Sequence, residues 1–182
     1  NNITLEINEE KVEYKLLALL EYTSERKRMS IIVRDRSQKI YLFMKGADSV
    51  VKASVTENTF LIPCVDDFLY EYSGDGLRTL MLAYKQISEN DFQDWYAKYQ
   101  LVLENLAEKE ELIPEIYNEI ERNLALLGST AINDQLQDNL IPTLQTFIKT
   151  GIHIWVLTGD KVNTAKSIAF SSKLISHEFI LL

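Results

Sequence analysis

Two basic side chains stand where they could bind a phosphate group. Lys45 ends an apolar segment and is followed by Gly46, whose small size lets a ligand approach the backbone. Arg78 offers a planar fork of donors that matches phosphate oxygens. Each also has an ordinary explanation, namely a surface lysine whose stem covers apolar neighbours and an arginine in a surface ion pair. Lys45 and Arg78 are therefore candidates for an anion site on residue type alone.

A third candidate is the sequence Thr158-Gly159-Asp160, which lies between an apolar segment and an expected helix. Backbone donors, a hydroxyl and a carboxylate meet there, so a phosphate and its magnesium ion could bind. An aspartate that only caps the following helix explains the same residues. Asp134 follows an earlier apolar segment that ends at Ile132. Two neighbouring strands are thus expected to end in a carboxylate.

The sequence lacks the signals of several other kinds of site. It has no Walker phosphate loop, no Gly-x-Gly-x-x-Gly and no paired-histidine motif, so any nucleotide site must be assembled from dispersed residues. The single Cys64 and the distant His153 and His177 predict neither a disulfide nor a metal site. The net charge of -8 argues against a nucleic-acid partner. No apolar run approaches the roughly 20 residues that span a bilayer, so we expect this segment to be soluble and cytosolic.

The charges are unevenly distributed along the chain. Between Ser24 and Lys45 there are seven basic residues and two acidic ones, a balance that could attract a small polyanion. Between Glu104 and Glu121 seven glutamates surround Lys109, which predicts the solvated face of helices. Surface solubility alone also explains both runs.

The elements that would carry these residues follow from periodicity. Apolar and branched segments predict antiparallel strands at Ile3–Ile7, Tyr14–Tyr22, Met29–Val33, Lys39–Lys45 and Leu77–Tyr84. A period of two places Tyr41, Phe43 and Lys45 on one face. Ser88 is an expected N-cap. Helices are predicted at Ala47–Ser54, Pro63–Tyr72, Asp91–Ala107 and Pro114–Arg122, the last opened by its proline.

The last third has a different pattern. Strands are predicted at Leu124–Ile132 and Ile152–Leu157, and helices at Gln137–Thr150 and Asn163–Leu174. This order of strand, helix, strand and helix favours a parallel sheet with crossover helices, whose ligands lie beyond the carboxyl ends of the strands. We therefore place a domain boundary near Asn123, which gives domains at residues 1–123 and 124–182.

Five motifs in this order resemble the P-type ATPases over nearly the whole chain. They are Glu21-Tyr-Thr-Ser-Glu-Arg-Lys-Arg-Met-Ser30, Lys45-Gly-Ala-Asp48, Gly76-Leu-Arg-Thr-Leu80, Leu127-Gly-Ser-Thr-Ala-Ile-Asn-Asp-Gln-Leu-Gln137 and Trp155-Val-Leu-Thr-Gly-Asp-Lys161. Several of them resemble the phospholipid-flippase branch in particular. The resemblance implies an N-terminally truncated α+β nucleotide-binding domain, an antiparallel sheet with flanking helices. A partial α/β phosphorylation domain of the haloacid-dehalogenase type is expected to follow it.

The resemblance also implies roles for the residues of the nucleotide-binding domain. Tyr22 stands where the family usually has a phenylalanine that stacks on adenine, and tyrosine keeps the stacking face. Ser24 and Lys27 are expected close to the same nucleotide. Lys45 matches the family lysine of the nucleotide pocket.

On the phosphate side, Arg78 and Thr79 match the pair that holds the phosphates. Thr158, Gly159 and Asp160 match the loop near the transferred phosphoryl group, with Thr158 and Asp160 in the catalytic role. The phosphorylated aspartate of the family's Asp-Lys-Thr-Gly-Thr motif is not in this sequence. The ligands of Mg²⁺ are expected to lie largely outside it too.

The function implied for the whole protein is phospholipid translocation driven by ATP hydrolysis, with ATP and Mg²⁺ as cofactors. This segment would lie on the cytoplasmic side of a multi-pass membrane protein with an accessory subunit as a further partner. The segment by itself is expected to bind nucleotide weakly without turnover. The alternatives are another P-type ATPase, a cation or orphan pump, and a non-catalytic ATPase-like regulatory module. A haloacid-dehalogenase-type phosphatase ranks last, because residues 1–120 are large for its cap domain.

Overall fold

The computed structural model describes residues 2–56, 60–105, 108–133, 136–159 and 162–175. The chain forms two compact units. The first comprises Asn1–Ile62 and Leu80–Ser129, and the second Pro63–Thr79 and Thr130–Leu182. These are groupings by compactness, so the domain boundary expected near Asn123 stays a prediction.

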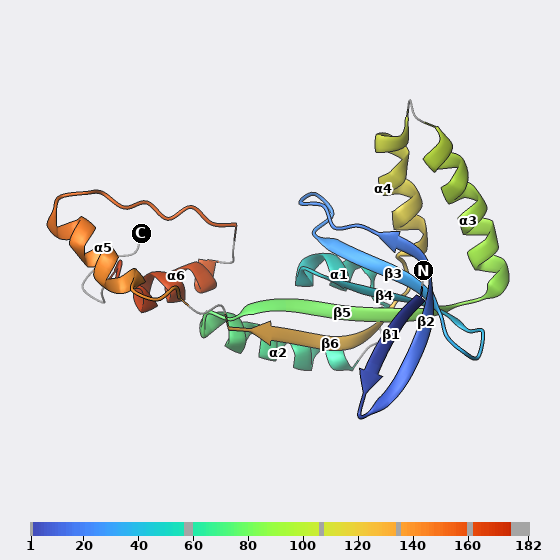
Figure 1. Ribbon diagram of the computed structural model, residues 1–182, viewed down its shortest axis with the longest axis horizontal. Helices are drawn as coiled ribbons and strands as arrows, with labels where there is room; N and C mark the ends of the chain where they lie inside the picture. The colour runs from blue at the N-terminus through green and yellow to red at the C-terminus, as the bar shows by residue number, and fades with distance from the viewer. Residues whose placement is uncertain (1, 57–59, 106–107, 134–135, 160–161, 176–182) are drawn as a thin grey trace. The chain divides into compact units, whose positions relative to one another are not determined.

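A six-stranded sheet runs through the chain in the order β1-β2-β3-β4-β5-β6 (Figure 1). Its strands are β1 (Asn2–Ile7), β2 (Glu10–Leu20), β3 (Arg28–Arg34), β4 (Ile40–Gly46), β5 (Arg78–Ile87) and β6 (Ala125–Ile132). Neighbours from β1 to β5 pair antiparallel. The antiparallel sheet with helices beside it confirms the predicted α+β class.

The two faces of β4 differ in burial, as its sequence predicts. Ile40, Leu42 and Met44 are buried, while Tyr41 and Phe43 are half-buried and Lys45 is exposed on the alternate positions. The open face carries a row of aromatic rings, because the Phe43 ring stacks 6.0 Å from that of Tyr41 and 6.3 Å from that of Tyr84 on β5. Lys45 continues this row toward the end of the strand.

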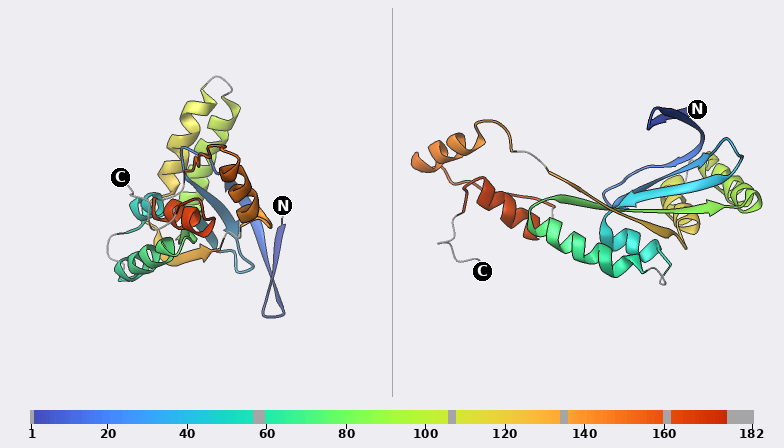
Figure 2. Two further views of the ribbon diagram at one scale, coloured as in Figure 1. Left: turned by 90° about the vertical axis from the view of Figure 1, so that its left-hand side faces the viewer. Right: turned by 90° about the horizontal axis from the view of Figure 1, so that it is seen from below.

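Helices α3 (Glu89–Glu104) and α4 (Lys109–Ile120) lie side by side as a helical hairpin (Figures 1 and 2). Ser88 caps α3 as predicted, because its Oγ accepts a hydrogen bond from the Asp91 amide at 3.1 Å. The buried Trp95 donates its Nε1–H to the Ile116 carbonyl at 2.8 Å and so joins the two helices. The predicted start of α4 at Pro114 is wrong, since the helix begins at Lys109 and contains the proline.

The short helix α1 (Asp48–Ser54) follows β4 directly and leads back to the sheet. Val55 forms a parallel bridge with Leu124, just before β6. The Leu124 amide donates to the Ser54 carbonyl at 3.0 Å, and the Thr56 amide donates to the Leu124 carbonyl at 3.0 Å. These bonds tie the end of α1 to the segment between α4 and β6.

The second unit contains most of α2 (Leu61–Gly74), together with α5 (Leu140–Lys149) and α6 (Val162–Ser171). The strand predicted at Ile152–Leu157 is not formed, and Trp155 and Leu157 are 85% and 95% exposed. A strand needs a neighbour for its backbone groups, and residues 152–157 pair with none of the strands that the structure describes. The predicted parallel sheet with crossover helices is therefore absent from the described residues.

Candidate functional site

The loop of residues 21–27, between β2 and β3, carries three of the predicted site residues. Strand pairing fixes where it begins and ends, because Leu20 lies opposite Ser30 and Arg28 lies opposite Gly46. The amide after Gly46, that of Ala47, donates to the Lys27 carbonyl at 2.9 Å. The end of the loop is therefore fastened to the end of β4, directly beside Lys45.

Gly46 is required by this contact. A Cβ atom at position 46 would lie 2.6 Å from the Arg28 Cβ and 2.7 Å from the Lys27 carbonyl oxygen, closer than real Cβ contacts allow. The glycine after Lys45 thus serves a purpose that the sequence suggested only in part. Because glycine has no Cβ, the backbone of the neighbouring loop can lie directly against the backbone of β4.

A small hollow of about 230 Å³ opens on the sheet beside Lys45. Its lining comes from β3, β4 and β5 and is almost entirely apolar apart from the lysine: Met29, Ser30, Ile31, Phe43, Met44, Lys45 and Leu82. An apolar hollow with a lysine in its lining suits a flat aromatic base that bears an anionic tail. The apolar lining and its lysine are therefore compatible with a nucleotide.

The loop residues are presented to solvent. Tyr22 is 59% exposed, so its ring is available for stacking. Ser24 and Lys27 are exposed as well, and Lys27 adopts a left-handed backbone conformation with φ of 50°. Tyr22, Ser24 and Lys27 thus share one loop that touches the residues after Lys45. The structure brings these four predicted positions into one region of the first unit.

The remaining predicted residues belong to the second unit. Arg78 is exposed and Thr79 half-buried at the beginning of β5, and Thr158 and Gly159 are exposed shortly before α6. Asp160 lies outside the described residues, as does Asp134. Their role in binding phosphate stays a prediction.

Comparison with known proteins identifies the family. Residues 1–58 match the family model described as P-type ATPase, cytoplasmic domain N. Phospholipid-transporting ATPase IK of Mus musculus is 39% identical over 183 residues, covering 100% of this chain and 14% of the relative. Phospholipid-transporting ATPase IC of Homo sapiens is 40% identical, covering 98% and 14%. Phospholipid-transporting ATPase 2 of Arabidopsis thaliana is 41% identical, covering 98% and 16%. The chain belongs to the P-type ATPase family.

This P-type ATPase segment spans about one seventh of the length of the curated relatives it matches, between 14% and 16%. All three relatives carry names of phospholipid-transporting ATPases, in agreement with the flippase branch that the motifs resemble. None of the helices that the structure describes is both long and apolar enough to cross a membrane.

The P-type ATPase segment also contains a buried carboxylate that sequence reasoning missed. Glu121 was expected on a solvated helix face, but its side chain is 0% exposed. Its Oε1 accepts from Arg26 Nη2 at 2.6 Å and from Ser30 Oγ at 2.6 Å, and its Oε2 accepts from Arg28 Nε at 2.7 Å. These charge-assisted bonds offset the cost of burying the charge.

The same contacts correct the interpretation of the basic segment. Of its arginines, Arg26 is buried and stacks its guanidinium over the Tyr117 ring, 4.6 Å from the centroid. Burial raises the pKa of the Tyr117 hydroxyl well above its usual value, and a hydrogen bond with Tyr99 raises it further. Arg28 donates its Nη2 to Asn118 Oδ1 on α4. Arg26 and Arg28 therefore hold structure together, and Lys27 between them is the exposed cation of this motif.

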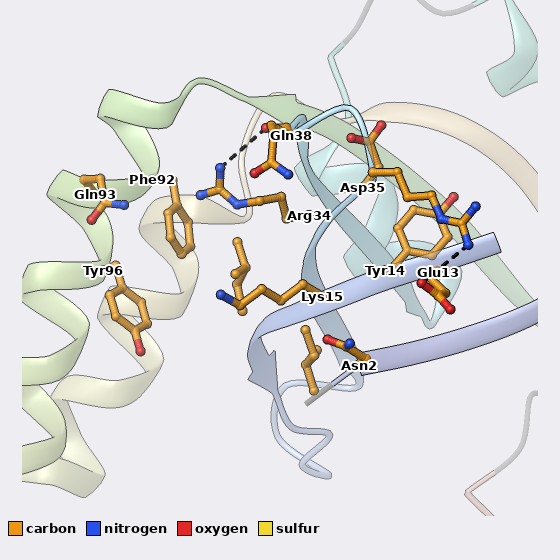
Figure 3. Close-up of a pocket in the computed structure, with 13 residues that line it drawn as sticks. Asn2, Glu13, Tyr14, Lys15, Arg34, Asp35, Gln38, Phe92, Gln93 and Tyr96 are labelled. Carbon is orange, nitrogen blue, oxygen red and sulfur yellow. Dashed lines mark hydrogen bonds and ion pairs between the residues drawn. The ribbon is translucent and has the colours of Figure 1, made fainter.

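A larger hollow of about 690 Å³ lies elsewhere in the first unit (Figure 3). Phe92 and Tyr96 of α3 form one side, and Lys15 of β2 and Arg34 of β3 lie opposite them. Arg34 is held by both carboxylate oxygens of Glu89, at 2.7 and 2.9 Å. The lining of this larger hollow contains none of the predicted site residues, so its size alone does not make it the nucleotide site.

The described residues contain no group of three histidine, cysteine, aspartate or glutamate side chains that could hold a metal ion. The Mg²⁺ that accompanies ATP in this family therefore has no ligand set assigned to it among them. What the described part of the segment offers is an apolar hollow with Lys45 in its lining, next to a loop whose Lys27 carbonyl accepts from the Ala47 amide.

Proposed function

We propose that this chain is the ATP-binding segment of a P-type ATPase that translocates phospholipids at the expense of ATP. The observation that carries the proposal is the apolar hollow with Lys45 at its edge, next to which the Lys27 carbonyl is bonded to the Ala47 amide. This arrangement supports a site for a base and its phosphates. Residues 1–123 form the nucleotide-binding domain in this proposal, and residues 124–182 a part of the phosphorylation domain.

Each candidate site residue of the first unit has a defined task in this proposal. The exposed Tyr22 ring stacks on one face of the adenine. Ser24 offers a hydroxyl to the nucleotide, and Lys27 and Lys45 neutralise phosphate charge. Phe43 supplies the apolar floor on which the base rests. Such a site binds and orients ATP, and orientation is most of what phosphoryl transfer requires of a protein.

The phosphate contacts in this proposal are assigned to residues later in the chain. Arg78 and Thr79 hold the phosphates, and the loop at Thr158, Gly159 and Asp160 lies near the transferred phosphoryl group. The acceptor aspartate and most ligands of Mg²⁺ lie outside this chain, and Mg²⁺ neutralises charge on the phosphates when bound.

Two observations in the second unit support a partial phosphorylation domain. Helix α5 has no buried residue, and Trp155 and Leu157 are 85% and 95% exposed. Exposed apolar surface of this kind marks a face that another part of a protein covers. Residues 152–157 become the predicted strand when neighbouring strands of a haloacid-dehalogenase-like sheet are present.

The substrate of the whole protein is a phospholipid in this proposal, because its relatives are named for phospholipid transport. The parent would be a multi-pass membrane protein with this segment on the cytoplasmic side, working with an accessory subunit. Its determinants of lipid choice would lie in the membrane-spanning part.

Calorimetric titration of the chain with ATP in the presence of Mg²⁺ tests the nucleotide site. We expect weak, saturable binding that is reduced by both Lys45→Ala and Tyr22→Ala. Lys39→Ala is the matched control, because Lys39 is exposed just before the other end of β4 and should leave binding unchanged. Saturable binding that survives both site substitutions would place the nucleotide elsewhere. No binding at all would favour a non-catalytic regulatory module.

A further inference from the structure

We propose that Glu121 is a positioning residue of the nucleotide site, which it serves by fixing the conformation of the 21–27 loop through Arg26 and Arg28. The inference rests on the proposed function, since it assigns the loop the task of holding a nucleotide. Glu121 itself has a fully buried side chain, so it offers no surface to a nucleotide.

The carboxylate is the common acceptor for both arginines of the motif. Arg26 and Arg28 reach different oxygens of Glu121, with bonds of 2.6 and 2.7 Å, and Ser30 adds a third bond of 2.6 Å. The side chains of Arg26 and Arg28 are only 8% and 14% exposed. Removal of the acceptor would leave two cationic groups poorly solvated and without their main partner, which is costly.

The arginines also carry this constraint into the loop. Arg26 donates its Nη1 to the Glu21 carbonyl at the start of the loop, and its amide donates to Thr23 Oγ1 at 3.1 Å. The Lys27 amide donates to the Thr23 carbonyl at 2.8 Å. The loop is thereby folded around the Arg26 side chain, whose Nη2 is held by the buried Glu121 carboxylate.

Lys27 stands between the two anchored arginines. Its left-handed backbone, with φ of 50°, and its carbonyl bond to the Ala47 amide both depend on where Arg26 and Arg28 are held. Glu121 therefore orients an exposed lysine, and through Glu21 and Thr23 it holds the residues on either side of Tyr22, without being part of the binding surface. A buried acid at the C-cap of α4 thus sets the geometry of a loop far earlier in the chain, with Arg26 and Glu121 95 positions apart.

The substitution Glu121→Gln tests this role, because glutamine keeps the shape and removes the charge. We expect the dissociation constant for ATP to rise about tenfold. The matched control is Glu119→Gln in the last turn of α4, whose carboxylate pairs with Lys98 at the surface and should leave the affinity unchanged. Both variants are compared at a temperature at which circular dichroism shows them folded. Ser30→Ala, which removes one of the three bonds, replaces Glu121→Gln if that variant does not fold, with an expected loss of about threefold.

A double-mutant cycle with Lys27→Ala separates positioning from general stability. If Glu121 acts through the loop, Lys27→Ala will cost less affinity in the Glu121→Gln background than in the wild type. We also expect the Ala47 amide to exchange its hydrogen faster in Glu121→Gln than in the wild type, alongside the loss of ATP affinity. The reason is that this amide donates to the Lys27 carbonyl.

The outcomes distinguish the inference from the proposed function. If the wild type binds ATP and Glu121→Gln binds it with equal affinity, the positioning role alone is overturned. The same holds if the effects of Glu121→Gln and Lys27→Ala in the cycle are strictly additive. A wild type that does not bind ATP overturns both proposals at once. A matched loss of affinity and of Ala47 protection, absent from Glu119→Gln, supports the role.

Discussion

Gly46 shows how a single residue can determine whether the candidate site exists. Its α-carbon faces the Lys27 carbonyl and the Arg28 Cβ at distances that leave no space for a methyl group. We expect Gly46→Ala to push the loop away from β4, to lower the free energy of unfolding by about 1 to 3 kcal/mol and to weaken ATP binding.

The matched control for this change is Gly74→Ala at the end of α2, where nothing lies within 4 Å of an added Cβ. Alanine in a helix is preferred over glycine, so this variant should be as stable as the wild type or more so, by up to about 1 kcal/mol. Urea denaturation of the two variants measures the difference. A Gly46→Ala variant as stable as Gly74→Ala would contradict the close contact.

Tyr22 carries a second prediction at this scale, because only its ring face is needed for stacking. Tyr22→Phe should bind ATP within about twofold of the wild type, whereas Tyr22→Ala should lose the stacking energy of about 1 to 3 kcal/mol. Fluorescence or calorimetric titration measures both. If Tyr22→Phe weakens binding as much as Tyr22→Ala does, the hydroxyl rather than the ring makes the contact.

Exposed residues of the candidate site are easier to choose from the sequence than the buried residue that supports them. Tyr22, Lys27 and Lys45 could be chosen because they belong to short motifs with a family resemblance. Glu121 could not be chosen, since its arginine partners lie 93 and 95 positions away and it is the last of a series of glutamates that begins at Glu104. Local charge patterns describe a solvated helix face and a buried ion pair in the same way.

At the scale of elements, the cap of α3 makes a testable contribution to stability. Ser88 Oγ accepts from the Asp91 amide at 3.1 Å, so Ser88→Ala leaves that donor without its protein partner. We expect a loss of about 1 kcal/mol in the free energy of unfolding, measured by urea denaturation. Ser88→Asn, which can still accept the bond, should restore most of it. An Ala variant as stable as the wild type would mean that the cap bond has no net value.

A second prediction for elements concerns pH and the link between β3 and α3. Hydrogen bonds from Arg34 hold the pKa of the Glu89 carboxyl at about 2, against an ordinary value of 4.5. Because this pKa is lowered in the folded state, the stabilisation by the pair is complete above pH 4.5 and is lost as the pH falls toward 2.

The measurement is the difference in melting temperature between the wild type and Glu89→Gln over this pH range. We expect it to be constant above pH 4.5 and to shrink between pH 4.5 and 2. Because both side chains reach the surface, salt should reduce the difference. A difference that does not change between pH 4.5 and 2 would contradict the lowered pKa.

The elements were predictable wherever local pattern and pairing agree. The five strands expected before residue 88 and the capped helix α3 are all present, because each has a periodic face and a turn that matches it. Residues 152–157 are the exception. Their apolar run predicts a buried strand, but burial needs neighbouring strands, and the described residues provide none.

For the whole chain, binding and turnover should be separable. The sequence contains no Asp-Lys-Thr-Gly-Thr motif to accept a phosphoryl group, so ATP bound to this segment has no acceptor within it. We expect no release of inorganic phosphate above the rate of a buffer control, even at ATP concentrations that saturate binding. Steady phosphate release that is abolished by Lys45→Ala would show that the segment catalyses hydrolysis without the family's acceptor.

The distance in sequence between Glu121 and its arginines also has a consequence for how the chain is made. Residues 1–58, the part that matches the family model, contain Tyr22, Lys27 and Lys45 but end long before Glu121. During synthesis, the early strands can pair while the two arginines still lack their acid, and contacts so far apart form late. The 21–27 loop would therefore reach its final shape only after α4 has left the ribosome, which makes assembly of the candidate site one of the last steps of folding rather than one of the first.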